Sequence, residues 1–133
     1  MVLVDTNVLI DILVKDRVWL DWSAEQLDRC RRSSRICTNE VGYAELAARI
    51  DSQASLEDAL DSLGIALERM PIAALFAAGQ AFRRYRAAGG PRLNALADFF
   101  LGAHAQSLRI TILTRDVRRY RTYFSDVTLI APV

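Results

Sequence analysis

Met1-Val2-Leu3-Val4-Asp5-Thr6-Asn7 is the stretch that decides the fold of this chain. Four apolar residues end abruptly on an acid, a hydroxyl and an amide. A short run that is apolar throughout is typical of a strand buried on both faces, as in a parallel sheet. We therefore expect a parallel strand over residues 1–4, with Asp5, Thr6 and Asn7 at its carboxyl end.

Strands and helices alternate along the rest of the chain. Apolar and β-branched runs predict further strands at residues 35–38, 65–69, 110–114 and 127–130. Apolar residues at helical spacing predict helices over residues 8–13, 18–32, 39–50, 53–63, 71–86, 95–108 and 117–124. This alternation favours βαβ units, so we predict one α/β domain over residues 1–133. It should contain a parallel sheet of about four to five strands with helices on both faces.

Single residues are expected to fix the ends and faces of these helices. Thr6 or Asn7 should cap the first helix, Thr38 or Asn39 the helix after the second strand, and Asn94 the helix over residues 95–108. The helix that begins at Pro71 should turn four residues inward, namely Leu75, Ala78, Gly79 and Phe82.

Composition limits the possible classes of protein. The chain has 133 residues, 52% of them hydrophobic, which suffices for one proper core. Its two cysteines, Cys30 and Cys37, and its single histidine, His104, fit neither a disulfide framework nor a zinc site, so we expect a reducing, cytoplasmic setting. The apolar run at the amino terminus is broken by Asp5 and Asp11 and has no basic flank. It therefore predicts neither a signal peptide nor a membrane span.

Charge is divided unequally between the two halves of the chain. Residues 1–68 contain 7 Lys and Arg against 13 Asp and Glu, a net charge of −6, whereas residues 69–133 contain 10 against 3, a net charge of +7. Every basic residue except Lys15 is arginine, whose planar fork matches phosphate oxygens. The asymmetry favours an anionic partner for the second half, and the alternative is that these arginines only solvate helix faces.

Four acids stand where polar side chains can meet. Asp5 and Asp116 follow predicted strands, and right-handed crossovers bring the carboxyl ends of such strands to one edge of the sheet, where open α/β sheets bind ligands. Glu45 and Asp98 lie among apolar residues on predicted helices. Taken singly, the first two acids also fit helix caps and the other two fit ion pairs with arginine.

Carboxylates gathered at one edge would repel one another unless a cation lay between them. Oxygen ligands without a His or Cys cluster suit a hard ion, Mg²⁺ or Mn²⁺. Such an ion binds a phosphate oxygen and activates a water molecule, so the implied chemistry is phosphodiester hydrolysis. Thr6, Asn7 and Thr114 would then support the ligands or orient the substrate, although each also fits a cap or a strand position.

Four segments of the sequence carry a resemblance to a known family, and together they span nearly the whole chain. Their order and approximate spacing are those of PIN-domain ribonucleases, most similar to the VapC-type toxins of toxin–antitoxin pairs. The segments are Val4-Asp5-Thr6-Asn7-Val8-Leu9-Ile10, Tyr43-Ala44-Glu45-Leu46, Asp98-Phe99-Phe100-Leu101-Gly102-Ala103-His104-Ala105 and Leu113-Thr114-Arg115-Asp116.

The resemblance implies a PIN-like α/β fold and a Mg²⁺- or Mn²⁺-dependent endoribonuclease that forms a homodimer and is inhibited by a cognate antitoxin. It also implies that Asn7 matches the polar residue beside the family's first acid, and that the family's catalytic, metal-binding quartet corresponds to Asp5, Glu45, Asp98 and Asp116. Many relatives carry a further acid after the fourth, where this chain has Val117, Arg118 and Arg119. We therefore expect one tightly held ion, with any second ion bound mainly through the substrate.

The RNA backbone is expected to contact the basic second half of the chain, because two of its three acids are assigned to the metal. The residues expected to supply this surface are Arg83, Arg84, Arg86, Arg115, Arg118 and Arg119. Arg115 and some of the others can equally be expected to meet an acidic antitoxin tail.

Rival functions find less support in the sequence. A receiver-like signalling module would need a lysine on a late strand, and the only lysine is Lys15. A phosphatase that used Asp5 as its nucleophile would need a second Asp where Asn7 stands. His104 lies six residues after Asp98, off the same helix face, and is expected to be a packed or a surface residue and not a general base. A non-catalytic PIN-like module that binds protein or RNA stays open as the alternative.

Overall fold

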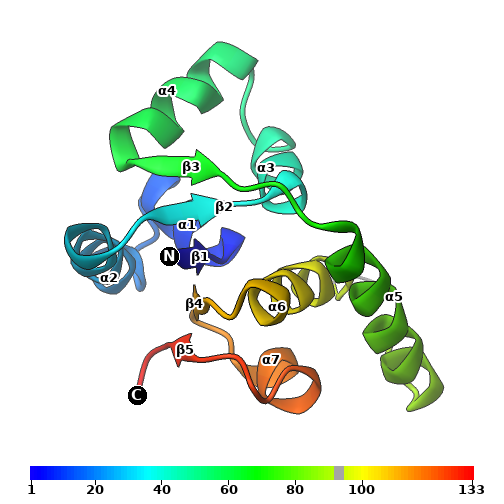
Figure 1. Ribbon diagram of the computed structural model, residues 1–133. Helices are drawn as coiled ribbons and strands as arrows, with labels where there is room; N and C mark the ends of the chain where they lie inside the picture. Colours follow the sequence, from blue (N-terminus) through cyan, green and yellow to red (C-terminus); the bar gives the residue numbers. More distant parts are fainter. Residues whose placement is uncertain (92–94) are drawn as a thin grey trace.

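A five-stranded parallel sheet forms the centre of the computed structural model, which describes residues 1–91 and 95–133 (Figure 1). The strands are β1 (Val2–Val4), β2 (Ile36–Thr38), β3 (Ile65–Leu67), β4 (Thr111–Leu113) and β5 (Leu129–Ile130). They lie in the order β3-β2-β1-β4-β5, and every neighbouring pair is parallel. The amino-terminal stretch therefore forms the middle strand of the sheet, and the predicted fold class is confirmed.

Helices cover both faces of this sheet. They are α1 (Thr6–Leu13), α2 (Leu20–Ser33), α3 (Glu40–Ala47), α4 (Gln53–Leu63), α5 (Ile72–Ala87), α6 (Leu96–Leu108) and α7 (Arg118–Tyr123). One hydrophobic core joins the sheet to α1, α2, α3 and α4, and a second joins it to α5, α6 and α7. Figure 1 shows α5, α6 and α7 gathered on one side of the molecule.

Alternate residues of β1 enter the two cores. Val2 and Val4 pack in the core of α1 to α4, whereas Leu3 packs in the core of α5 to α7. Side chains of a strand point alternately to the two faces of its sheet, and both faces of β1 are covered. This position explains why the stretch is apolar throughout, and why the first polar side chain, Asp5, marks the edge of the sheet.

The helix caps agree only in part with the sequence-based expectations. The carboxylate of Asp5 accepts a hydrogen bond from the backbone N–H of Asn7 at 3.3 Å, so Asp5 caps α1 and the expectation of Thr6 or Asn7 is wrong. The side chain of Asn39 accepts from the N–H of Gly42 at 3.0 Å and caps α3 as predicted. The predicted cap at Asn94 lies outside the described residues.

The buried face of α5 is narrower than its sequence suggests. Leu75 and Gly79, which were expected to point inward, are exposed, and the residues that are fully buried are the small ones, Ala74, Ala78 and Ala81. Small residues allow the α5 backbone to lie close to its neighbours. Large apolar residues lie on the exposed side of α5 instead, and Ile72 is 83% and Phe76 70% exposed.

No helix within residues 1–91 or 95–133 combines the length and the apolar character needed to cross a lipid bilayer.

Candidate active site

The four acids of the predicted quartet lie around the carboxyl edge of the central strands. Asp5 directly follows β1, and Asp116 follows β4 by three residues. Glu45 comes from α3, and Asp98 comes from the first turn of α6. They are close enough to influence one another, because Asp5 contributes to the raised pKa of both Glu45 and Asp98. The parallel sheet thus gathers acids from four separate segments.

Asp5 is buried and is held by hydroxyl groups. Its side-chain oxygen Oδ2 accepts a hydrogen bond from Thr114 Oγ1 at 2.8 Å and another from the Tyr120 hydroxyl at 2.7 Å. Burial raises the pKa of Asp5, and these two hydrogen bonds oppose that shift by stabilising the carboxylate. The other oxygen, Oδ1, receives only the longer contact from the N–H of Asn7 within residues 1–91 and 95–133. Asp5 therefore keeps one oxygen much less engaged than the other.

Glu45 is partly buried beside the start of α1. Thr6 donates from Oγ1 to Glu45 Oε1 at 2.8 Å, a contact between residues 39 positions apart in the sequence. Burial raises the pKa of Glu45, and repulsion from Asp5 adds to the shift. Thr6 therefore contacts a member of the quartet, and its support of a metal ligand stays a prediction.

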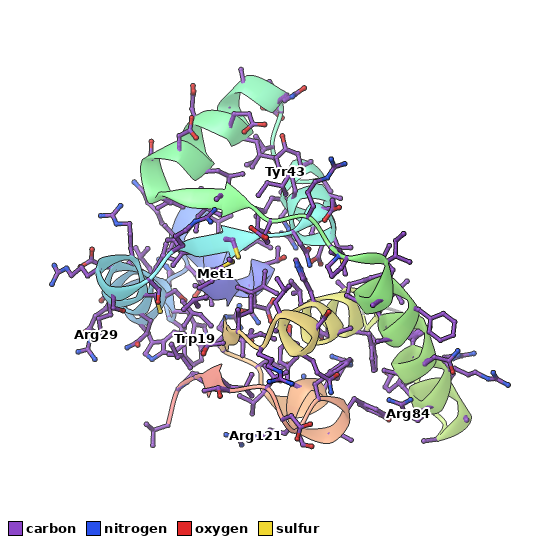
Figure 2. All side chains as sticks on the ribbon, viewed as in Figure 1. Met1, Trp19, Arg29, Tyr43, Arg84 and Arg121 are labelled. Carbon is purple, nitrogen blue, oxygen red and sulfur yellow. The ribbon has the colours of Figure 1, made fainter. Side chains whose placement is uncertain are left out.

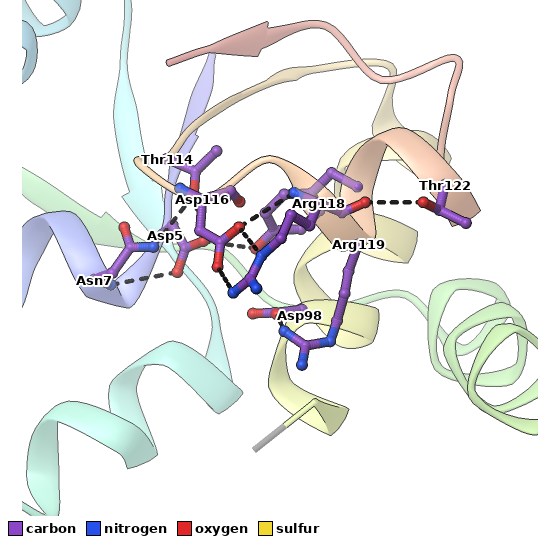
Figure 3. Close-up of polar contacts among 9 residues, drawn as sticks. Asp5, Asn7, Asp98, Thr114, Asp116, Arg118, Arg119 and Thr122 are labelled. Atoms are coloured by element: carbon purple, nitrogen blue, oxygen red, sulfur yellow. Dashed lines mark hydrogen bonds and ion pairs between the residues drawn. The ribbon is translucent and has the colours of Figure 1, made fainter. Parts of the chain in front are cut away.

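Asp98 and Asp116 each face an arginine of α7 (Figure 3). Arg119 donates from Nη1 to Asp98 Oδ2 at 2.9 Å, and Arg118 uses Nε and Nη2 to bind both oxygens of Asp116, at 3.0 and 2.6 Å. Burial, followed by repulsion from Asp5, raises the pKa of Asp98 to about 7 although Arg119 opposes the shift. The pKa of Asp116 is lowered, chiefly by its hydrogen bond to Arg118.

The donor chemistry of this edge suits a hard divalent cation, but the side chains are not arranged as a finished metal site. Within the described residues, no three His, Cys, Asp or Glu side chains are spaced to hold one ion together. Two of the four acids pair instead with arginines of α7. For Asp98 this is the ion pair that was left open as an alternative, whereas for Asp116 the alternative was a helix cap and the ion pair with Arg118 was not anticipated. Glu45 and Asp98 nevertheless have raised pKa values, so a cation among these carboxylates would relieve their desolvation and mutual repulsion.

Asn7 and Thr114 connect α1 to the turn after β4. Asn7 donates from Nδ2 to Thr114 Oγ1 at 3.3 Å, and its Oδ1 accepts from the N–H of Arg115 at 3.4 Å. Thr114 Oγ1 also accepts from the N–H of Asp116 at 3.1 Å. Thr114 therefore touches the first and the fourth acid of the quartet, and Asn7 holds Thr114.

The arginines expected to bind RNA fall into three structural groups, one of which is Arg118 and Arg119, paired with Asp116 and Asp98. Arg83, Arg84 and Arg86 are exposed along the last turns of α5, and Figure 2 shows Arg84 on the outside of that helix. Arg115, by contrast, makes a two-pronged ion pair with Asp11, at 2.8 and 3.0 Å. Its guanidinium also lies 5.5 Å from the centre of the Trp19 ring. These contacts give Arg115 a structural role, and its contact with RNA stays a prediction.

Three features escaped the sequence-based reasoning. Tyr120 was seen only as part of a short helix, although a tyrosine that is 1% exposed needs a partner for its hydroxyl. Asp11 was seen only as a break in an apolar run, although an acid amid the core residues of α1 predicts a buried partner. The third feature is the partner of His104, which is fully buried: its Nδ1 lies 3.1 Å from Nδ2 of Asn39, the residue that caps α3.

Comparison with known proteins connects this geometry to a family. The sequence model of the PIN domain matches residues 2–125. The chain belongs to the PIN-domain family. No curated protein sequence was found to match the chain.

Several solved structures share the fold of this PIN domain. VapBC2 from Rickettsia felis, solved bound to a promoter DNA fragment, is 16% identical over 98% of both chains, with a TM-score of 0.73. VapBC-1 from nontypeable Haemophilus influenzae is 21% identical over 98% of both chains, with a TM-score of 0.72. FitAcB from Neisseria gonorrhoeae is 21% identical over 98% of this chain and 96% of its own, with a TM-score of 0.65. These similarities confirm the PIN-like architecture.

Proposed function

We propose that this PIN domain is a Mg²⁺- or Mn²⁺-dependent endoribonuclease and the toxin of a VapC-type pair, working in the cytoplasm and inhibited by a cognate antitoxin. The observation that carries the proposal is the meeting of Asp5, Glu45, Asp98 and Asp116 at the carboxyl edge of the sheet. The raised pKa of Asp98, about 7, marks a carboxylate placed where negative charge is unfavourable without a cation.

These four carboxylates would hold the ion, and Asp5 Oδ1, Glu45 Oε2 and Asp98 Oδ1 accept no short hydrogen bond within the described part of the chain. When bound, the ion supplies a polarised phosphate oxygen and a water molecule of lowered pKa. Thr6 holds Glu45 and Thr114 holds Asp5, so each hydroxyl keeps its carboxylate oriented. One tightly held ion is proposed, because Arg118 and Arg119 stand where an additional acid would be needed for a second.

The RNA backbone is proposed to run along the side of the site formed by α5 and α7. The two helices approach each other through Tyr85 and Tyr123, whose ring centres are 5.9 Å apart, and Arg119 lies 5.8 Å from the centre of the Tyr85 ring. Arg118 and the partly buried Arg119 pair with Asp116 and Asp98, and α5, whose exposed arginines are Arg83, Arg84 and Arg86, packs beside α7. Such a surface neutralises phosphates without reading sequence.

Two apolar surfaces support the proposed protein partners. The exposed side of α5 carries Ile72 and Phe76, which suits the interface of a homodimer. A groove between α1, α3 and α4 has an apolar lining that suits an amphipathic segment of an antitoxin, and its residues include Ile10, Leu13, Val14, Leu46 and Ile50. The solved structures with a similar fold include a toxin–antitoxin complex from Klebsiella pneumoniae, which supports a partner of this kind.

Cleavage of a structured RNA tests the proposal. Wild-type protein should cut the RNA with Mg²⁺ or Mn²⁺ and lose this activity with a chelator, whereas Asp5→Asn should bind RNA and fail to cut. Asp126→Asn, which changes an exposed acid to its amide, is the matched control and should cut normally. Full activity in folded Asp5→Asn would refute the mechanism.

A non-catalytic PIN-like module that binds RNA or protein is the second candidate. The ion pairs of Asp98 and Asp116 with Arg119 and Arg118 favour it, because they satisfy two of the acids without a cation. Calorimetry with Mn²⁺ separates the two candidates. The proposed nuclease should bind Mn²⁺, and Asp5→Asn should abolish that binding. A binding module should not need the ion, so its affinity for RNA should be the same with and without Mn²⁺.

A further inference from the structure

Tyr120 brings a hydroxyl group to Asp5 from the opposite end of the sequence. The residue belongs to α7, lies 115 positions from Asp5, and is 1% exposed. Its ring is part of the core between the sheet and α5, α6 and α7. An ordinary tyrosine hydroxyl is protonated at neutral pH, so it acts as a hydrogen-bond donor to the carboxylate.

Two hydroxyl groups converge on the same oxygen of Asp5. Thr114 reaches Oδ2 from the end of β4 at 2.8 Å, and Tyr120 reaches it from α7 at 2.7 Å. A carboxylate oxygen has two lone-pair sites, so these donors occupy both sites of Oδ2. Rotation of the carboxylate about its Cβ–Cγ bond would break both contacts at once. The pair therefore fixes Oδ1 as the oxygen of Asp5 that has no hydroxyl partner and accepts only the longer contact from the N–H of Asn7 among the described residues.

We propose that Tyr120 is a positioning residue for Asp5: its hydroxyl, with that of Thr114, engages Oδ2 and leaves Oδ1 to the catalytic cation. This inference rests on the proposed function, in which Asp5 is a metal ligand. Tyr120 itself touches neither cation nor RNA in this scheme. It acts by holding the carboxylate in the orientation that the cation needs, as partners of metal ligands commonly do.

The second tyrosine of α7, Tyr123, serves as a control for the packing role of Tyr120. Tyr123 lies on the same helix, packs against Tyr85 and Phe99, and donates no hydrogen bond among those found in the described residues. Tyr120→Phe and Tyr123→Phe therefore both remove one hydroxyl and keep the aromatic ring, but only the first removes a donor from Asp5.

The test combines a binding measurement with a kinetic one. Tyr120→Phe should weaken Mn²⁺ binding, measured by calorimetry at constant pH, by about tenfold, as loss of a partner of a metal ligand typically does. At saturating RNA and limiting Mn²⁺, cleavage should fall by a similar factor with the KM for RNA unchanged. Tyr123→Phe should stay within twofold of wild type in both measurements. Equal Mn²⁺ affinities in wild type and folded Tyr120→Phe would overturn the proposal.

Crystal structures of wild type and Tyr120→Phe provide a readout that needs no metal. The Asp5 carboxylate should rotate or take two orientations in the variant, and an unchanged orientation would overturn the positioning role. If wild type neither binds Mn²⁺ nor cuts RNA, the proposed function fails. The carboxylate orientation then still decides whether Tyr120 holds Asp5.

Discussion

Loss of the Arg115 guanidinium should destabilise the protein strongly. Asp11 is 1% exposed and accepts three hydrogen bonds, two from Arg115 and one from Ser23 Oγ at 2.8 Å. Arg115→Met removes two of these donors and leaves a buried carboxylate with a single hydroxyl partner. The contact with Trp19 is lost as well.

The size of the effect follows from how the pair is buried. Removal of one partner from a fully buried ion pair costs about 3–5 kcal/mol. The Arg115 side chain is 31% exposed, so solvent weakens the pair and the lower end of that range applies, about 3 kcal/mol. Unfolding entropy of about 2.1 cal/mol/K per residue over 133 residues turns this into a fall in Tm of about 10 °C.

Thermal and urea unfolding of three variants measures this prediction. Arg115→Met should lose the most stability, because it leaves a buried charge unpaired. Asp11→Asn should lose less, since the amide still fills the site and Arg115 is partly exposed to water. The double variant Asp11→Asn/Arg115→Met should be more stable than Arg115→Met alone. A cost below 1 kcal/mol for Arg115→Met, or losses that simply add in the double variant, would refute the reasoning.

Three further changes have expected outcomes that can be measured directly. Asp98→Asn should raise the Tm of chelator-treated protein more at pH 8 than at pH 5. The pKa of Asp98 is raised from 3.8 to about 7, so between these values the native protein keeps a proton that the unfolded chain releases. The wild-type protein therefore loses stability as the pH rises through this window, and the asparagine variant is spared that loss. Arg118→Gln should tighten Mn²⁺ binding about two- to fivefold in calorimetry, because it removes the guanidinium that contacts both oxygens of Asp116 and leaves only the backbone N–H of residue 118 on Oδ1. The exposed Arg121→Gln should change the affinity less, and equal effects of the two variants would point to net charge alone. Gly102→Ala should destabilise the protein by about 1–3 kcal/mol in urea unfolding, because its methyl group would overlap the Phe124 ring, and a neutral effect would contradict the packing of α6 on α7.

Local pattern was sufficient to predict the sheet and the place of the acids. The run from Met1 to Val4 predicted a strand covered on both faces, and the parallel arrangement then placed Asp5 and Asp116 at one edge. The burial of a strand that is apolar throughout and the shared edge of parallel strand ends both follow from the order of the elements and from the two-residue period of a strand. Glu45 and Asp98 could be found in the same way, because each interrupts an otherwise apolar helix face.

Contacts between distant side chains could not be predicted in this way. The pairing of Asp11 with Arg115 spans 104 residues and depends on how the end of β4 faces α1. The contact from Tyr120 to Asp5 depends on the rotation of a six-residue helix about its own axis. The periodicity of apolar residues predicts which side chains are buried, but it does not predict the hydrogen-bond partners of a buried polar side chain. The same reason explains why the ion pair of Asp98 was only an open alternative, and why that of Asp116 was not anticipated.

The central position of β1 has a consequence for synthesis of the protein on the ribosome. This strand is made first, yet one of its two neighbours is β4, and Thr114, which holds Asp5, lies 109 residues further along. At about 5–20 residues per second, the nascent chain waits on the order of 5 to 20 seconds before this contact can form. Until then Asp5 lacks its support from Thr114, and Asp116 and α7 do not exist. A ribosome that makes the proposed nuclease is thus shielded from it until most of the chain has emerged.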